Sequence, residues 1–240
     1  MNILYLSVVP FKIDKNPSIY TDLIQELDNF GDQITVVSID SSLKPFQIKE
    51  VREKNIDLIY IGSFQLYNVN IFRKGLSILS LPFFMRRAVK KLDLKKYELI
   101  LYETPPITWA GIVKEIKKKN KIKSFLMLKD IFPQNAVDIE LMKKDSLIFK
   151  YFKRKEKLLY EVSDYIGCMS NGNVDYVLEN NPEISKEKVY YFPNTKKDTG
   201  NGNIDFEKEK LQFVYGGNMG LPQGVLNIAP AISYFKNDRD

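Results

Sequence analysis

The residues best placed for chemistry are a few carboxylates, lysines and glycines, because the sequence contains no histidine. Without histidine, the usual general base, the usual zinc ligand and the histidine-activated nucleophiles are excluded. Catalysis must then use carboxylates, backbone groups, lysine or arginine. The single cysteine, Cys168, lies in the apolar run DYIGCMS and is expected to be a buried thiol rather than a redox centre.

Asp130 and Glu103 are the first candidates to contact a substrate hydroxyl. Each follows an apolar run with strand character, Ser124 to Leu128 and Glu98 to Tyr102, and open α/β sheets bind ligands at such strand ends. A carboxylate there could orient or deprotonate an acceptor hydroxyl. Structural alternatives stay open: Asp130 could cap the next helix, and Glu103 could pair with a lysine or be a solvated acid at a helix entry.

A glycine-rich loop near the end of the sequence could hold a phosphate. Its candidate residues are Gly216, Gly217, Asn218 and Gly220, between an expected strand (Leu211 to Tyr215) and an expected helix (Val225 to Phe235). Missing Cβ atoms let backbone N–H groups approach a diphosphate, and a helix N-terminus attracts anions. A tight turn without a ligand is the alternative.

These candidates need a sheet that brings strand ends together. Short apolar runs alternate with segments of helical period, and most of the runs are apolar on both faces, which is typical of a parallel sheet covered on both sides. We therefore expect a Rossmann-like, doubly wound α/β fold. The remaining expected strands are Asn2 to Val9, Gln33 to Ile39, Asp57 to Gly62, Asp164 to Met169 and Lys188 to Phe192. The remaining expected helices are Ser18 to Asn29, Phe46 to Lys54, Phe72 to Leu92, Ile107 to Lys119, Asp145 to Val162 and Asn173 to Glu179.

The composition divides the chain into three parts. Residues 1–194 are expected to form the Rossmann-like domain, and the polar, glycine-bearing stretch 195–210 a linker. Residues 211–240 supply one strand and one helix, which cannot bury a core of their own. They are expected to be the first βα unit of an incomplete second domain.

Five phrases in chain order, spaced as whole βα units, resemble glycosyltransferase family 4 and in particular its bacterial capsule and O-antigen branch. They are TPPIT (Thr104 to Thr108), KDIFPQ (Lys129 to Gln134), SDYIGCMS, YFPN (Tyr191 to Asn194) and FVYGGNMGLPQG (Phe213 to Gly224). The resemblance implies a GT-B fold of two facing Rossmann-like domains, with the acceptor on the first and a nucleotide sugar on the second. It implies sugar transfer with retention of anomeric configuration and no metal or other cofactor.

The resemblance also implies roles for individual residues. It assigns Asp130 to the catalytic cleft, the glycine loop and Asn194 to the donor, and Glu103 and Thr104 to the acceptor. For Asn194 a turn is the alternative.

The loop after the first strand departs from the family pattern. Many relatives have paired glycines there, but this chain has no glycine before Gly31. Lys12 is the candidate for a phosphate contact in their place, and a solvated loop is the alternative.

The acceptors that the resemblance implies are polyprenyl-diphosphate-linked sugars held at a bilayer. The segment Leu76 to Lys96 combines leucine and phenylalanine with Arg86, Arg87, Lys90 and Lys91, which suits an anionic membrane surface, and packing against the core is the alternative. For the second basic segment, SLIFKYFKRKEKLLYEV, a core-packed helix is the preferred interpretation. With no spanning run and no signal peptide, a cytoplasmic protein peripheral to the inner face of the membrane is expected.

The sequence therefore predicts a retaining glycosyltransferase of cell-surface polysaccharide synthesis, with this chain expected to be inactive alone. A non-catalytic, acceptor- or partner-binding remnant of such an enzyme is the alternative. The net charge of +6 also raises nucleic-acid binding, but no recognised motif supports it, and no nucleic-acid partner is expected.

Overall fold

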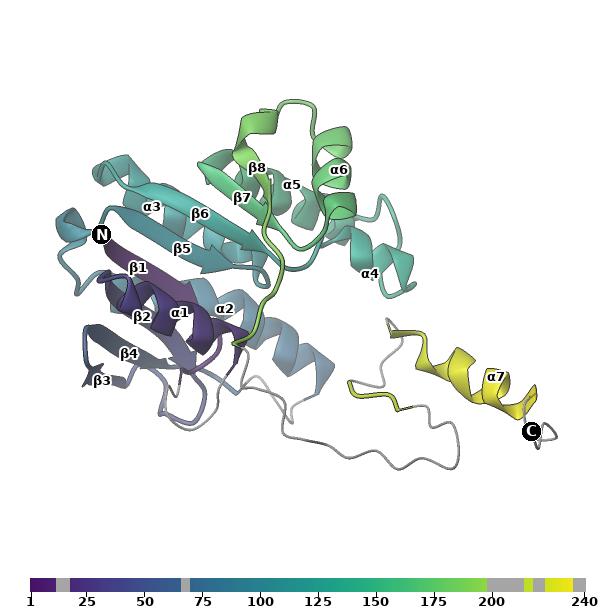
Figure 1. The fold of residues 1–240 in the computed structure, drawn as a ribbon, viewed down its shortest axis with the longest axis horizontal. Helices are drawn as coiled ribbons and strands as arrows, with labels where there is room; N and C mark the ends of the chain where they lie inside the picture. The colour runs from purple at the N-terminus through teal and green to yellow at the C-terminus, as the bar shows by residue number, and fades with distance from the viewer. Residues whose placement is uncertain (12–17, 66–69, 198–213, 218–222, 235–240) are drawn as a thin grey trace.

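The chain folds around an eight-stranded sheet in the computed structural model, which describes residues 1–11, 18–65, 70–197, 214–217 and 223–234 (Figure 1). The strand order is β3-β4-β2-β1-β5-β6-β7-β8, and every pairing is parallel except β3 with β4. The strands are β1 (Asn2–Ser7), β2 (Gln33–Asp40), β3 (Ile48–Glu53), β4 (Ile56–Gly62), β5 (Leu99–Glu103), β6 (Lys123–Leu128), β7 (Tyr165–Cys168) and β8 (Val189–Tyr191).

The order in which the chain adds strands to the sheet reverses at the centre of the sheet. From β1 the chain builds outward through β2 to β4, then returns to place β5 on the other side of β1. Connections on the two sides of such a switch point leave the sheet in opposite directions and open a crevice at the carboxyl ends of the strands. The predicted doubly wound α/β sheet is confirmed, and its switch point, where such sheets have their crevice, lies between β1 and β5.

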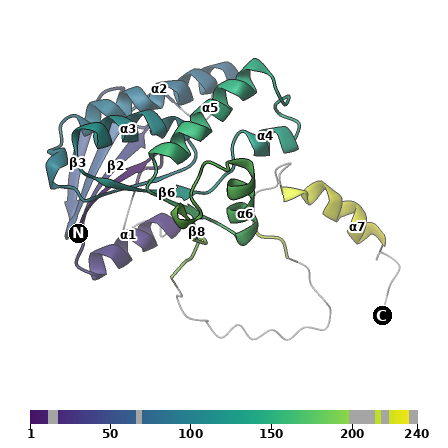
Figure 2. The same cartoon turned by 90° about the horizontal axis from the view of Figure 1, so that it is seen from above.

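Helices cover both faces of the sheet (Figure 2). α1 (Ile19–Asn29) packs on one face through Ile24, whereas α2 (Ile71–Val89), α3 (Ala110–Lys119) and α5 (Leu147–Val162) share the core of the other face. Smaller elements complete the fold: η1 (Leu94–Lys96), η2 (Ile107–Trp109), α4 (Gln134–Asp138), α6 (Asn171–Asn180), η3 (Lys186–Lys188), η5 (Val225–Asn227) and α7 (Ile228–Tyr234).

The helix predicted over Phe46 to Lys54 is wrong, because this segment contains β3. Two half-buried apolar residues three apart, Ile48 and Val51, fit a helix or a strand equally well.

The last part of the described chain agrees with prediction only for its helix. η5 and α7 fall within the expected helix Val225 to Phe235. Val214 and Tyr215 lie outside any strand, contrary to the expected strand Leu211 to Tyr215, whose first three residues lie outside the described part. A strand is stable only when a neighbour pairs with it. The domain boundaries at 194 and 210 stay a prediction.

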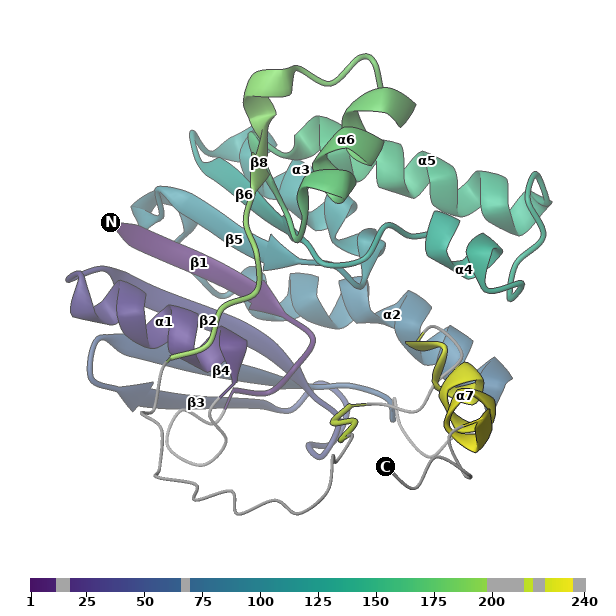
Figure 3. The same ribbon diagram turned by 45° about the vertical axis from the view of Figure 1, so that its right-hand side comes forward.

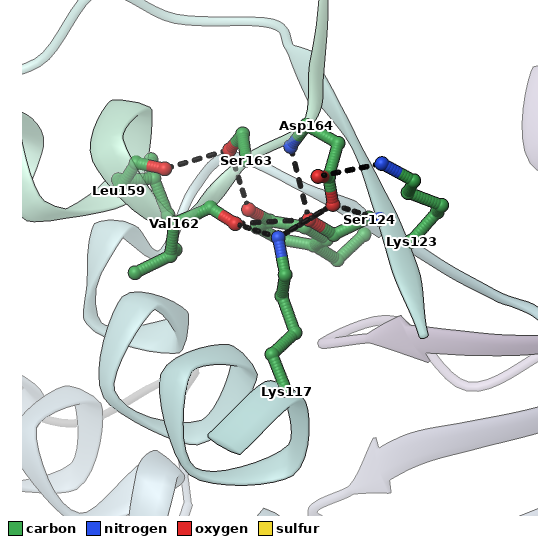
Figure 4. A network of polar contacts seen from close by, with 8 residues as sticks. Lys117, Lys123, Ser124, Leu159, Val162, Ser163 and Asp164 are labelled. Carbon is green, nitrogen blue, oxygen red and sulfur yellow. Dashed lines mark hydrogen bonds and ion pairs between the residues drawn. The ribbon is translucent and has the colours of Figure 1, made fainter. Parts of the chain in front are cut away.

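A polar network joins four elements at the amino edge of the sheet (Figure 4). The Lys117 Nζ donates to Asp164 Oδ2 at 2.5 Å, to the Val162 carbonyl oxygen at 2.6 Å and to Ser124 Oγ at 3.1 Å. Asp164 Oδ2 also accepts from the Ser124 backbone N–H at 2.9 Å. The end of α3, the end of α5 and the starts of β6 and β7 are thereby held together, far along the strands from the crevice.

Cys168 ends β7 and is fully buried, as predicted. Burial raises the pKa of its thiol to about 11. The thiol is therefore protonated at neutral pH, which suits a core residue rather than a redox centre.

Candidate functional site

A buried carboxylate stands at the switch point of the sheet. Glu103 ends β5, and its two oxygens accept hydrogen bonds from the neighbouring strand: Tyr5 Oη at 2.6 Å and Ser7 Oγ at 2.8 Å. Tyr5 and Ser7 are two residues apart on β1, so their side chains lie on the same face of the sheet. Glu103 lies on this face too, because Tyr5 pairs with Leu101, two residues before Glu103 on β5. The two central strands are tied together at their carboxyl ends by this pair of bonds.

Glu103 lies beneath the crevice rather than in it. The residue is 2% exposed, and burial raises the pKa of its carboxyl although the hydrogen bonds from Tyr5 and Ser7 and the charge of Lys129 oppose the rise. The solvated interpretation of Glu103 is therefore wrong. Both oxygens already have donors, so Glu103 acts on its neighbours through charge and hydrogen bonding.

Thr104 anchors the end of β6, which leads into Lys129 and Asp130. Its backbone N–H donates to the Met127 carbonyl at 3.1 Å, and its Oγ1 accepts from the Lys129 backbone N–H at 3.1 Å. The residue is fully buried. Thr104 thus fixes the turn from β6 into Lys129 and Asp130.

Lys129 is the functional candidate that the sequence analysis missed. Its Nζ donates to Asn194 Oδ1 and lies 4.9 Å from the centre of the Tyr20 ring. Burial lowers the pKa of Lys129, and the charge of Glu103 opposes the change. Within the described residues Lys129 forms no salt bridge at 4 Å or less, so its ammonium can serve an anionic ligand.

Asp130 lies beside Lys129 on the open side of the crevice. The N-cap residue of α4 is Pro133, and no side-chain hydrogen bond caps this helix, so the helix-capping interpretation of Asp130 is wrong. The side chain is exposed, yet the partial burial of its carboxyl raises its pKa. In the described part of the chain nothing hydrogen-bonds to this carboxylate, which leaves it free to accept a proton or a hydrogen bond.

Three aromatic residues pack together next to Lys129. Phe11 packs edge-on against Tyr5, with ring centres 5.3 Å apart, and lies 6.4 Å from Tyr20. Burial, assisted by the charges of Glu103 and Asp130, raises the pKa of Tyr20 to about 12. Tyr20 thus stays neutral and offers its ring face to the Lys129 cation.

Asn194 belongs to a segment that crosses the sheet after β8 (Figure 3). This segment starts with the Phe192 N–H donating to the Cys168 carbonyl at 2.7 Å and reaches α1, where the Lys197 N–H donates to Asp22 Oδ2 at 3.1 Å. Between these two points, Asn194 accepts the hydrogen bond from Lys129. The structure therefore brings Asn194, Lys129 and Asp130 to one edge, with Glu103 and Thr104 beneath them.

The remaining predicted site residues are not joined to this cluster. Lys12, Asn218 and Gly220 lie outside the described residues. Gly216 and Gly217 are exposed and outside any helix or strand, and a Cβ added at Gly216 would meet nothing within 4 Å. Their diphosphate role stays a prediction.

The cluster combines an exposed carboxylate with a neighbouring ammonium. An exposed carboxylate can accept from a hydroxyl, and an adjacent ammonium can neutralise a phosphate oxygen. In the described ranges no three Asp, Glu or Cys side chains gather as metal ligands would.

Known proteins resemble this chain in sequence and in fold. No family model matches it. It is 27% identical over 123 residues to the probable glycosyltransferase WbjE of Pseudomonas aeruginosa, covering 48% of this chain and 30% of WbjE. It is 26% identical over 239 residues to the protein CapK of Staphylococcus aureus, covering 93% of this chain and 52% of CapK. The chain thus spans about half or less of the curated relatives it matches.

Among solved structures, the α,α-trehalose-phosphate synthase (UDP-forming) of Burkholderia vietnamiensis aligns with a TM-score of 0.55 at 12% identity. The alignment covers 80% of this chain and 48% of the synthase. Because the identity is so low, this likeness establishes the fold alone, which is that of GT-B glycosyltransferases. The predicted resemblance to GT-B glycosyltransferases is confirmed, whereas the assignment to family 4 stays a prediction.

Proposed function

We propose that this chain is the acceptor-side part of a retaining, metal-independent glycosyltransferase. The enzyme would transfer a sugar from a nucleotide sugar to a lipid-linked or saccharide acceptor in the synthesis of a cell-surface polysaccharide. The observation that carries the proposal is the position of two adjacent charged side chains at the β1–β5 switch point, above the buried Glu103. In the described residues the Lys129 ammonium forms no salt bridge and the Asp130 carboxylate accepts no hydrogen bond. The names of WbjE and the UDP-forming synthase support a sugar transferase with a nucleotide donor.

In the proposed reaction Asp130 accepts a hydrogen bond from the acceptor hydroxyl. The anomeric carbon–oxygen bond to the nucleoside diphosphate breaks, and a bond from the acceptor oxygen to the same carbon forms on the same face. The hydroxyl proton passes to Asp130, whose raised pKa makes it a better base than an ordinary aspartate, or to the departing phosphate.

Lys129 and Glu103 supply the electrostatics of the proposed site. The Lys129 ammonium would neutralise a phosphate oxygen of donor or acceptor, and the nearby Glu103 favours its charged form. We propose Gly216, Gly217, Asn218 and Gly220 for the donor diphosphate, with Asn194 beside it. Lys12 is proposed for the acceptor phosphate.

The α2 surface supports a membrane-held acceptor. We use this name for Leu76, Leu79 and Phe83, which are exposed, together with Arg87 and Lys90. The opposite face of α2 is buried, so the core interpretation holds for that face, and we propose membrane contact for the exposed face. No helix in the described part of the chain is long and apolar enough to cross a membrane. From the exposed apolar and basic residues of the α2 surface we propose peripheral binding at the inner face of the cell membrane, from the cytoplasmic side.

A transfer assay tests the proposal. The longest natural product of the gene is incubated with pooled labelled nucleotide sugars and a membrane extract that contains polyprenyl-linked acceptors. Asp130→Asn is expected to lower transfer at least about 100-fold, as loss of a general base does. Lys129→Met is expected to raise the KM for the substrate whose phosphate it contacts.

The control is Glu161→Gln, which removes an exposed acid at the amino edge of the sheet. Wild-type rates for Asp130→Asn would refute its catalytic role. Saturable acceptor binding by a wild-type protein that transfers none of the pooled sugars would favour a non-catalytic binding module.

A further inference from the structure

We infer that the start of α5 and the residues just before it form a second surface that docks on an anionic bilayer, in addition to the α2 surface. The α5 surface comprises the apolar residues Leu141, Leu147, Ile148 and Tyr151 and the cations Lys143, Lys144 and Lys150. The inference rests on the proposed function, which places the acceptor at a membrane, and it names a second contact with that membrane.

The apolar residues of the α5 surface do not face the core. Leu147 is 86% exposed and Ile148 62% exposed, whereas Phe149, Glu156 and Leu159 of the same helix are buried. Nine residues, about two and a half helical turns, separate Leu147 from Glu156, so the two lie on opposite sides of α5. The preferred core-packed interpretation of this segment is therefore right for one face of the helix and wrong for the other.

The charges around these residues are mostly positive. Residues 140–155 contain six lysines and arginines and two acids, Glu140 and Asp145. Lys153 is paired with Glu156 at 2.5 Å, and Lys155 lies over the Tyr151 ring at 5.4 Å. As far as the described chain extends, Lys143, Lys144 and Lys150 form no salt bridge, so their charges are available to a partner.

A bilayer fits this composition better than a protein does. The cores of protein interfaces are depleted in lysine, because desolvating an ammonium is costly. At a membrane surface, leucine, isoleucine and tyrosine enter the headgroup layer while neighbouring lysines stay hydrated beside anionic lipids.

The helices that carry the α5 surface and the α2 surface lie in the same helical layer of the molecule. α2 and α5 flank α3 and η2 on one face of the sheet, opposite α1 (Figure 2). Both helices extend beyond the carboxyl ends of the strands on the side where α4 lies (Figure 3). Contact with one membrane through both surfaces would fix the tilt of the domain and hold the Asp130 edge close to the lipid headgroups.

Vesicle co-sedimentation tests this inference. The chain is mixed with phosphatidylcholine vesicles that contain or lack phosphatidylglycerol, in the absence of donor and acceptor. Lys143→Gln/Lys144→Gln/Lys150→Gln is expected to weaken binding to the anionic vesicles on the order of 100-fold, at about fivefold per lysine. Leu147→Gln/Ile148→Gln is expected to weaken it at least about tenfold.

Matched controls change the same residue types elsewhere. Lys118→Gln/Lys119→Gln/Lys121→Gln removes three exposed lysines at the amino edge, and Phe30→Gln removes an apolar side chain that is 84% exposed at the end of α1. Both controls should bind like the wild type. Circular dichroism of every variant identifies any loss of binding that comes from unfolding.

Two results with the α5 variants would overturn the inference. One is normal binding by both α5 variants. The other is a wild-type dimer that Leu147→Gln/Ile148→Gln converts to a monomer, which would make the surface an interface between copies. Because no sugar is present, vesicle binding without transferase activity would reject the proposed function alone, and transfer without vesicle binding would reject this inference alone.

Discussion

Replacing Lys117 by methionine should destabilise the fold by about 2–3 kcal/mol. The change removes three donated hydrogen bonds and leaves Asp164 Oδ2 and the Val162 carbonyl without their charged partner. Removing one partner of a buried ion pair costs about 3–5 kcal/mol. The side chains of Lys117 and Asp164 are 24% and 23% exposed, so water can replace part of what is lost, and a smaller cost follows.

The pH dependence of this cost identifies its origin. Burial raises the pKa of Asp164, but Lys117 and Ser124 outweigh it, and the net pKa is lowered. A carboxyl with a lowered pKa stabilises the fold above its unfolded pKa of about 3.9 and loses that contribution as the pH falls through the folded value. The difference between wild type and Lys117→Met should therefore be constant from pH 7 to pH 5 and shrink below about pH 4.

Urea unfolding followed by the fluorescence of Trp109, the single tryptophan and a fully buried one, measures this difference. Lys118→Met, an exposed neighbour on α3, is the control and should unfold like the wild type. A cost below about 0.5 kcal/mol for Lys117→Met, or a cost that stays the same at pH 3.5, would show that the network does not stabilise the fold in this way.

Three further measurements test the packing and the buried charge. Because burial raises the pKa of Glu103, the cost of ionising it should be absent below about pH 4 and grow as the pH rises. The free energy of unfolding of Glu103→Gln, relative to wild type, should therefore increase from pH 4 to pH 7. Gly167→Ala should lower the free energy of unfolding in urea by about 1–3 kcal/mol, because the added Cβ would lie 2.7 Å from the Phe192 Cβ. Gly75→Ala is the contrast: no atom lies within 4 Å of its added Cβ, so this change should stabilise α2 by about 0.5–1 kcal/mol. Cys168 should react with a thiol reagent in urea but remain unlabelled in the native protein.

The parallel part of the sheet was predictable because its strands carry their own signal. Runs such as Ile34 to Ile39 are apolar on both faces, which a parallel strand between two helical layers requires. β3 gave no such signal, since its charged residues alternate irregularly with Ile48 and Val51. Only the turn at Lys54 and Asn55 distinguished a hairpin from a helix, and its backbone conformation depends on the pairing with β4.

The site was predictable at the level of strand ends and not at the level of contacts. Asp130 and Glu103 could be placed on one edge because parallel strands end together. The burial of Glu103 depends on Tyr5 and Ser7, which belong to a strand almost 100 residues earlier in the sequence. Two polar residues at alternate positions of the apolar β1 were the available signal. The contact between Lys129 and Asn194 depends on the path of the chain after β8, which local sequence does not encode.

The two edges of the sheet also bear on how the protein behaves at high concentration. An edge strand with free N–H and C=O groups invites another copy to pair with it and start an aggregate. At one edge, β3 carries Lys49, Glu50, Arg52 and Glu53, whose charges disfavour pairing with a strand of another copy. At the other, β8 pairs over three residues and is followed by Phe192 and then Pro193, which has no N–H to donate. A chain that exposes as many apolar side chains as this one is thus guarded against fibre-like growth at both ends of its sheet.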